Sequence, residues 1–225
     1  MRHITAISDL SVEEIDALIL RARDIMAQPG RYREACRHKK LATLFYEPST
    51  RTRLSFEAAM YELGGQVLGF SQADASSAAK GESVADTIRT VCCYADLIAM
   101  RHHKEGAPTV ASHYATVPVI NAGDGWHQHP TQALLDCYTI RQHLGGVDGR
   151  HIAIIGDIKH SRVARSDVEA FTALGAEVTL VAPPTLLPPS LEGWPVKVSH
   201  DLDAVLPTVD VAYLLLSLIH ISEPT

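Results

Sequence analysis

The chain has 225 residues, of which 46% are hydrophobic and 20% charged, so it can bury one large core or two smaller ones. A net charge of −6 and a pI near 6.0 exclude the general basic surface that binds nucleic acid or anionic membranes. No apolar run reaches the roughly 18 residues of a membrane span, no secretory signal opens the chain, and the four cysteines form no CxxC pair, which favours a cytosolic protein.

Apolar runs rich in β-branched residues alternate with segments of helical spacing along most of the chain. Helices are predicted at 11–27, 51–63, 82–94, 107–114, 130–143 and 161–174. Strands are predicted at 41–46, 66–70, 97–101, 117–121, 151–155, 178–182 and 211–215. This alternation predicts an α/β fold with parallel sheets and right-handed crossovers.

A Gly-rich turn at 144–150 (LGGVDGR) separates two such α/β regions, and HIAIIGD after it has the character of a new first strand. We therefore predict two doubly wound parallel-sheet domains, 1–135 and 136–225, joined by the helix at 130–143. The second domain holds about three predicted strands, so we expect it to be incomplete and its sheet to end at an apolar edge.

The stretch EPSTRTR at 47–53 precedes a predicted helix and places Arg51 and Arg53 in its first turn. Positive charge there opposes the helix dipole, whereas a helix that only needed a cap would favour Asp or Glu. A bound phosphate would reverse the sign, because it accepts hydrogen bonds from free N–H groups, a guanidinium and nearby hydroxyls. The hydroxyls available are those of Ser49, Thr50 and Thr52.

An alternative interpretation of the same stretch needs no ligand. The helix would be capped by Ser or Thr, and its two arginines would point to solvent or pair with Glu47 and Glu57. Local chemistry leaves both interpretations open.

Two further stretches place polar side chains before predicted helices. SSAAKGES at 76–83 carries Lys80, which by itself has the character of an ordinary surface lysine. NAGDGWHQHPTQALLD at 121–136 places His129 and Gln132 at a helix N-terminus, with Pro130 suited to the first helical position. Its HQH segment has no third ligand at a suitable spacing, so we expect no zinc site.

GDIKHSRVARS at 156–166 repeats the pattern, with Ser161 as a predicted N-cap and Arg162 and Arg165 near the helix start. A dinucleotide site would need GxGxxG after the strand and an acidic residue about 20 positions further on. Only Gly156 is present, and the next strand ends in VAPP, so nicotinamide cofactor binding is not expected.

Five motifs together resemble the aspartate/ornithine carbamoyltransferase family in their order and spacing, from about Thr5 to about Leu215. They are FYEPSTRTRLSFEAAMYELGG, KGESVADTIRT, MRHHKEG, NAGDGWHQHPTQALLD and GDIKHSRVARS. STRTR and HPTQ are common to the aspartate and ornithine enzymes, whereas NAGDG and KGES resemble the aspartate enzymes. The resemblance implies transfer of the carbamoyl group of carbamoyl phosphate to the amine of L-aspartate, an early step of pyrimidine synthesis, without metal or cofactor.

The resemblance also implies roles for individual residues. The residues that would hold the phosphate are Ser49, Thr50, Arg51 and Thr52. Thr52, Arg101 and His129 would polarise the carbamoyl carbonyl and stabilise the oxyanion of the tetrahedral intermediate. Gln132 would bind the carbamoyl NH2 group, and Arg162 would hold a carboxylate of aspartate.

Ser76 and Lys80 match loop residues that, in this family, enter the active site of a neighbouring subunit. Ser76 would then contact carbamoyl phosphate and Lys80 aspartate, and the working form would be a homotrimer. The sequence does not decide whether a regulatory chain or a dihydroorotase-like partner associates with it.

The end of the sequence departs from the family pattern. Residues from about Leu216 read LSLIHISEPT, match no family segment and are interpreted as a non-native tail at 216–225. The family's arginine-bearing aspartate loop and its His-Pro-Leu-Pro segment are not in the sequence. Two alternatives to the aspartate enzyme therefore stay open, namely an ornithine or other amine carbamoyltransferase and a non-catalytic anion-binding fragment.

Overall fold

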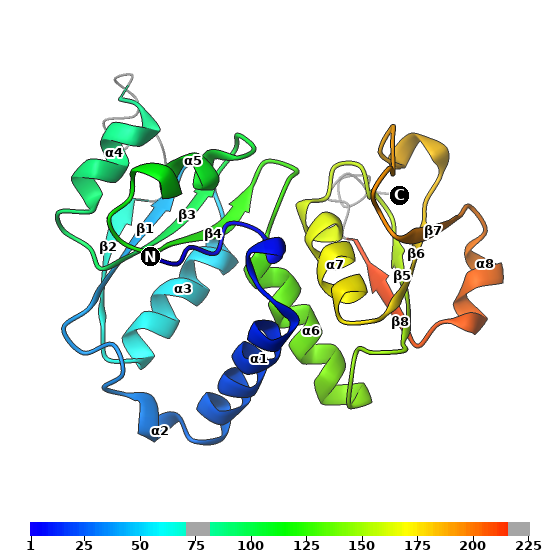
Figure 1. Cartoon of the computed structure of the whole chain (residues 1–225), viewed down its shortest axis with the longest axis horizontal. Coiled ribbons are helices and arrows are strands. Elements are labelled where there is room, and N and C mark those ends of the chain that lie inside the picture. The colour runs from blue at the N-terminus through cyan, green and yellow to red at the C-terminus, as the bar shows by residue number, and fades with distance from the viewer. Residues whose placement is uncertain (71–81, 216–225) are drawn as a thin grey trace, which may run out of the picture. The chain divides into compact units, whose positions relative to one another are not determined.

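The computed structural model describes residues 1–70 and 82–215 and divides the chain into two compact units, Met1–Thr131 and Gln132–Thr225. Each unit contains a four-stranded sheet whose strands all run parallel (Figure 1). The predicted α/β fold with two parallel sheets is confirmed. No helix of the described residues is long and apolar enough to cross a membrane.

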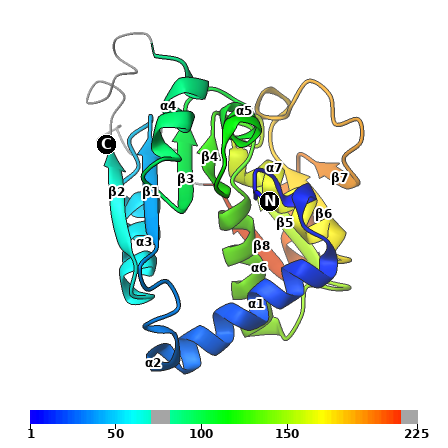
Figure 2. The same ribbon diagram turned by 60° about the vertical axis from the view of Figure 1, so that its left-hand side comes forward.

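The sheet of the first unit has the strand order β2-β1-β3-β4, which Figure 2 shows side by side. Its strands are β1 (Lys40–Phe45), β2 (Gln66–Phe70), β3 (Leu97–His102) and β4 (Val119–Asp124). The chain leaves β1 toward β2 and returns on the other side of β1 to form β3. Strand order therefore reverses between β1 and β3, and ligands of such sheets bind at the carboxyl ends of the strands beside this switch point.

Helices cover both faces of this sheet, with α4 and α5 on one side and α3 on the other (Figure 1). The helices of this unit are α1 (Val12–Ala27), α2 (Pro29–Tyr32), α3 (Thr50–Glu62), α4 (Val84–Val91) and α5 (Ala107–Tyr114). Alternation along the strands explains the arrangement, since Ala42 and Leu44 pack under α4 and α5 while Leu41 packs against Met60 of α3. Ser11 and Glu14 form the capping box that starts α1.

The second unit has the strand order β7-β6-β5-β8. Its elements are α6 (Pro130–Leu144, which begins in the first unit), β5 (His151–Ile155), α7 (Arg162–Ala173), β6 (Glu177–Val181), β7 (Val196–Ser199), α8 (Leu202–Val205) and β8 (Val211–Leu214). The prediction of about three strands was wrong, because β7 adds a fourth. That strand has only four residues, its central Lys197 and Val198 are exposed, and a Pro-rich loop precedes it, so it carries little strand pattern.

Strand β8 pairs with β5 and, among the described residues, with no other strand. Its side chains alternate between half-buried and exposed, and Leu214 is 72% exposed. This edge agrees with the apolar edge expected from the sequence.

Gly69 allows β1 and β2 to approach closely. Its φ is +144°, and a Cβ atom added there would overlap the backbone carbonyl of Thr43, its partner in β1. We expect Gly69→Ala to lower the free energy of unfolding by about 3 kcal/mol, measured by urea denaturation. Gly30→Ala is the matched control, because no atom lies within 4 Å of its added Cβ, and its stability should not fall. Equal stability of the two variants would contradict this account of Gly69.

Candidate active site

Three segments of the first unit bring polar side chains to the carboxyl ends of adjacent strands. Residues 47–53 follow β1, Arg101 lies near the end of β3, and His129 follows the turn after β4. Since β1, β3 and β4 are neighbours in the sheet, these segments meet beside the switch point. They contain six of the ten residues proposed from the sequence.

The N-terminus of α3 is not capped by a side chain. Ser49 is its N-cap residue with extended backbone (φ −158°, ψ 94°), and its hydroxyl makes no capping hydrogen bond. No acidic residue lies in the first turn, where Thr50, Arg51 and Thr52 follow. The first N–H groups of a helix have no intrahelical acceptor, so this end presents donors and a positive dipole to an anion.

The two arginines of this turn differ in their contacts. The Arg53 Nε atom lies 3.2 Å from Glu57 Oε1, one helical turn further on. The exposed Arg51 side chain makes no hydrogen bond or ion pair with another residue in 1–70 or 82–215. The ligand-free alternative is therefore right for Arg53 and Glu57, whereas Arg51 remains available to a bound anion.

Glu47 pairs with Arg101 of β3. Its Oε1 atom accepts hydrogen bonds from Arg101 Nη2 at 2.7 Å and from Nε at 3.2 Å. The third guanidinium nitrogen, Nη1, lies 3.4 Å from the Thr52 hydroxyl and 3.5 Å from the Ala122 carbonyl. The Arg101 side chain is only 14% exposed. Glu47 thus orients a largely buried cation so that it faces the first turn of α3.

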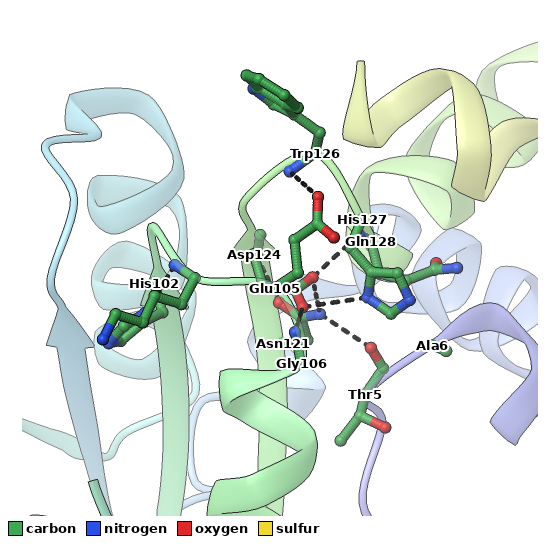
Figure 3. A network of polar contacts seen from close by, with 12 residues as sticks. Thr5, Ala6, His102, Glu105, Gly106, Asn121, Asp124, Trp126, His127 and Gln128 are labelled. Atoms are coloured by element: carbon green, nitrogen blue, oxygen red, sulfur yellow. Dashed lines mark hydrogen bonds and ion pairs between the residues drawn. The ribbon is translucent and has the colours of Figure 1, made fainter. Parts of the chain in front are cut away.

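A buried carboxylate, that of Asp124, organises the turn that leads to His129 (Figure 3). Asp124 is 1% exposed and ends β4. Its oxygens accept hydrogen bonds from the Asn121 amide (2.9 Å), Gly106 N (2.6 Å) and Gln128 N (2.9 Å), and Oδ2 lies 3.1 Å from His127 Nδ1. Four contacts to a single side chain fix the turn in one conformation.

Asn121 extends this network to the N-terminal segment. Its amide also donates to the Thr5 carbonyl at 2.9 Å (Figure 3). Its carbonyl accepts from Gly123 N at 2.8 Å. The NAGDG motif is therefore a scaffold that the sequence did not reveal as one. The only signal in the sequence is an Asn and an Asp among glycines at a strand end, which also describes many solvent-exposed turns.

His129 emerges from this turn as the residue before α6. It is 7% exposed, and its Nδ1 atom lies 3.4 Å from the Thr131 hydroxyl. Pro130 occupies the first helical position, as predicted. No group of three or more His, Cys, Asp and Glu side chains in the described part of the chain has the geometry to hold a metal ion.

His102 is a buried neutral histidine beside this region. Its Nδ1 atom accepts a hydrogen bond from Lys104 N at 2.9 Å, and its ring stacks on His103. Burial, reinforced by the charges of His103 and Lys104, lowers the pKa of His102 to about 4. The imidazole is therefore uncharged at neutral pH and acts as a structural acceptor.

This shift predicts loss of stability in acid. The pKa of His102 is lower in the folded protein than its ordinary value of 6.5, so its contribution is complete above pH 6.5 and is lost as pH falls toward 4. We expect this to lower the free energy of unfolding by about 2 kcal/mol. His102→Asn keeps an acceptor but does not titrate. The urea midpoint should therefore fall less between pH 7 and pH 5 in the variant than in the unaltered protein. Equal falls would show that His102 does not contribute.

Gln132 and Arg162 belong to the second unit. The Gln132 amide in the first turn of α6 donates to both Asp136 oxygens, at 3.1 and 3.2 Å, which leaves its carbonyl oxygen as the acceptor. Arg162 is the first residue of α7, whose predicted cap is confirmed because the Ser161 hydroxyl accepts from Ala164 N at 3.1 Å. Arg165 lies over the Trp194 ring at 5.3 Å. Ser76 and Lys80 lie outside the described residues.

Comparisons with known proteins agree with this arrangement. Residues 2–142 match the family described as "Aspartate/ornithine carbamoyltransferase, carbamoyl-P binding domain". The chain is 51% identical over 223 residues to the aspartate carbamoyltransferase catalytic subunit of Lachnoclostridium phytofermentans, covering 95% of this chain and 73% of that protein. It is 51% identical over 219 residues to the same subunit of Acidothermus cellulolyticus, covering 96% of this chain and 68% of that protein.

Solved structures give the same result. Aspartate transcarbamoylase from Trypanosoma cruzi, in complex with aspartate and phosphate, has a TM-score of 0.90 at 37% identity and covers 97% of this chain and 76% of that one. The catalytic subunit of the M. jannaschii enzyme has a TM-score of 0.84 at 44% identity and covers 95% and 73%.

The chain has two parallel sheets, and a helix N-terminus open to an anion lies at the switch point of the first. This is the arrangement of a carbamoyltransferase, and the chain belongs to the aspartate/ornithine carbamoyltransferase family. The relatives just described place it more narrowly, among the aspartate carbamoyltransferase catalytic subunits.

Proposed function

We propose that this chain transfers the carbamoyl group of carbamoyl phosphate to the amine of L-aspartate, giving N-carbamoyl-L-aspartate and phosphate. The observation that carries the proposal is the uncapped start of α3, where Arg51 has no partner among the described residues and Arg101 faces Thr52. A related structure, that of the Trypanosoma cruzi enzyme, holds carbamoyl phosphate and aspartate together.

The start of α3 would bind the phosphate group. Its free N–H groups and the Arg51 guanidinium would donate to the phosphate oxygens, helped by hydroxyls of the same turn. Those hydroxyls belong to Ser49, Thr50 and Thr52. The phosphate would supply the negative charge that this helix end lacks, so binding would remove the conflict between Arg51 and the helix dipole.

Arg101, Thr52 and His129 would act on the carbamoyl carbonyl. The amine nitrogen attacks the carbamoyl carbon, and negative charge develops on the carbonyl oxygen. The carbonyl then re-forms as the C–O bond to phosphate breaks with its electron pair leaving on phosphate, which also takes the proton that the amine loses. Donors fixed before the reaction stabilise that charge without reorganising. Glu47 and the Asp124 network would supply this fixation for Arg101 and His129.

The remaining assignments complete the proposal. The Gln132 carbonyl would accept from the carbamoyl NH2 group, because its own amide is held by Asp136. Arg162 would hold a carboxylate of aspartate through its planar guanidinium. Ser76 and Lys80 would be donated by a neighbouring subunit of a homotrimer in the cytoplasm.

The direct test supplies the purified chain with radiolabelled carbamoyl phosphate and either L-aspartate or L-ornithine. We expect labelled carbamoyl-aspartate with the first amine and no product with the second. Product from ornithine alone would identify the other branch of the family. Carbamoyl phosphate binding by calorimetry without product from either amine would leave only an anion-binding fragment.

A further inference from the structure

The second unit contains two carboxyl groups that face each other, Asp136 on α6 and Asp167 on α7. Asp167 is fully buried, and neither of its oxygens accepts a hydrogen bond from an N–H or O–H group of the described residues. Asp136 accepts from the Gln132 amide and from the Tyr213 hydroxyl of β8, the latter at 3.1 Å. Among the described residues, the Asp136 carboxyl is the group that a proton on Asp167 could bond to, since the two side chains lie within hydrogen-bond reach of each other.

Two ionised carboxylates cannot be hydrogen-bonded to each other, because both are acceptors only. One proton on the pair changes this, since a protonated Asp167 can donate its O–H to Asp136. Burial, and then the negative charge of Asp136, raises the pKa of Asp167 well above its ordinary value, and burial also raises the pKa of Asp136.

The other ionisable groups around the pair do not compensate its charge. Cys137, next to Asp136 on α6, has a pKa raised to about 12 by burial, so it stays a neutral thiol. Burial also raises the pKa of the Tyr213 hydroxyl on β8, which stays a donor. The positive charge of Arg141 on α6 partly opposes the raised pKa of the Cys137 thiol. Among the described residues, no cation is a cause of the pKa shift of Asp136 or Asp167.

We propose that Asp136 and Asp167 share one proton in the folded protein and that this acid pair positions Gln132 for the reaction. The second half rests on the proposed function, which assigns Gln132 to the carbamoyl NH2 group. With the proton on Asp167, the Asp136 carboxylate keeps both oxygens as acceptors for the Gln132 amide. The Gln132 carbonyl is then held in one orientation, and a single carboxylate ties α6 to α7 and β8.

The shared proton predicts a loss of stability as pH rises. A carboxyl group whose pKa is raised by folding stabilises the folded state below its ordinary value of 3.8, and that contribution is lost as pH rises toward the raised value. Over this interval the ratio of folded to unfolded protein falls by about tenfold per pH unit relative to a protein without the shared proton.

Asp167→Asn isolates this effect, because the amide keeps a donor toward Asp136 and does not titrate. We expect the urea midpoint of the variant, relative to the unaltered protein, to rise steadily as pH increases above 3.8 toward the raised pKa of Asp167. Asp203→Asn, at an exposed aspartate of α8, is the matched control and should give a pH profile parallel to the unaltered protein. Parallel profiles for Asp167→Asn would overturn the shared proton. Infrared spectra of the folded protein at neutral pH should also show a protonated carboxyl band that Asp167→Asn lacks.

Kinetics test the positioning role separately. Asp136→Asn replaces the acceptor of the Gln132 amide, so we expect the KM for carbamoyl phosphate to rise about tenfold, as for loss of a charged hydrogen bond. In the unaltered protein this KM should rise with pH, whereas in Asp167→Asn it should not. An unchanged KM in Asp136→Asn would overturn the positioning role. Gln132→Ala tests the proposed function by itself. If this variant leaves the KM for carbamoyl phosphate unchanged, the assignment of Gln132 fails, whereas the stability profiles still test the shared proton.

Discussion

Replacing Arg101 with alanine is expected to reduce kcat/KM for carbamoyl transfer about a thousandfold, the upper range for loss of one fixed oxyanion donor. The Arg101 guanidinium is largely buried, is bonded twice to Glu47 and faces the Thr52 hydroxyl, so its position is set before substrate binds. Alanine removes both the positive charge and the fork that presents it. Water filling the space would donate hydrogen bonds but would have to reorganise as charge develops.

Steady-state assays with Arg53→Ala as the control separate this effect from a general loss of positive charge. Arg53 lies in the first turn of α3, next to Thr52, but its guanidinium pairs with Glu57. Its replacement should therefore change kcat/KM less than twofold. Arg101→Lys keeps the charge without the planar fork and should fall between the two. If Arg101→Ala kept its fold and stayed within tenfold of the unaltered protein, Arg101 would not be the oxyanion donor.

Much of the fold follows from patterns within short windows of sequence. The strands at 66–70 and 151–155 and the helix at 107–114 were predicted at their observed bounds, because apolar alternation and helical spacing are local signals. The sequence did not predict strand β7, because its pairing with β6, and not its own apolar content, makes it a strand. It did not predict the short helix α8 either, since four residues show no periodicity.

The candidate site was predictable only where its chemistry conflicts with a local rule. Arg51 could be singled out because a cation in the first turn of a helix opposes the dipole. The partners that fix the site are distant in sequence and leave no such trace. Glu47 lies 54 residues from Arg101, and Thr5 lies 116 residues from Asn121. Only the fold shows that these residues belong together.

The Asp124 network leads to the second large prediction, a loss of about 4 kcal/mol in the free energy of unfolding for Asp124→Ala. Alanine would leave the Gly106 and Gln128 N–H groups without their acceptor and would remove one partner of the Asn121 amide, all beside a buried position (Figure 3). A buried donor without an acceptor costs its full desolvation, so the loss exceeds that of an exposed hydrogen bond. Urea denaturation measures it.

Glu105→Gln is the matched control, since Glu105 is exposed and its carboxylate accepts a 3.4 Å hydrogen bond from Trp126 N of the same turn. Glutamine keeps an acceptor and nearly the same shape, so stability should change by no more than about 0.5 kcal/mol. Asp124→Asn keeps one carbonyl oxygen but turns an NH2 group toward a donor, so its cost should be intermediate. If the network also positions His129, kcat/KM of the folded Asp124→Asn protein should fall with little change in KM, because the donor acts on the transition state. Normal kcat/KM in a destabilised variant would show that the turn stabilises the fold without controlling His129.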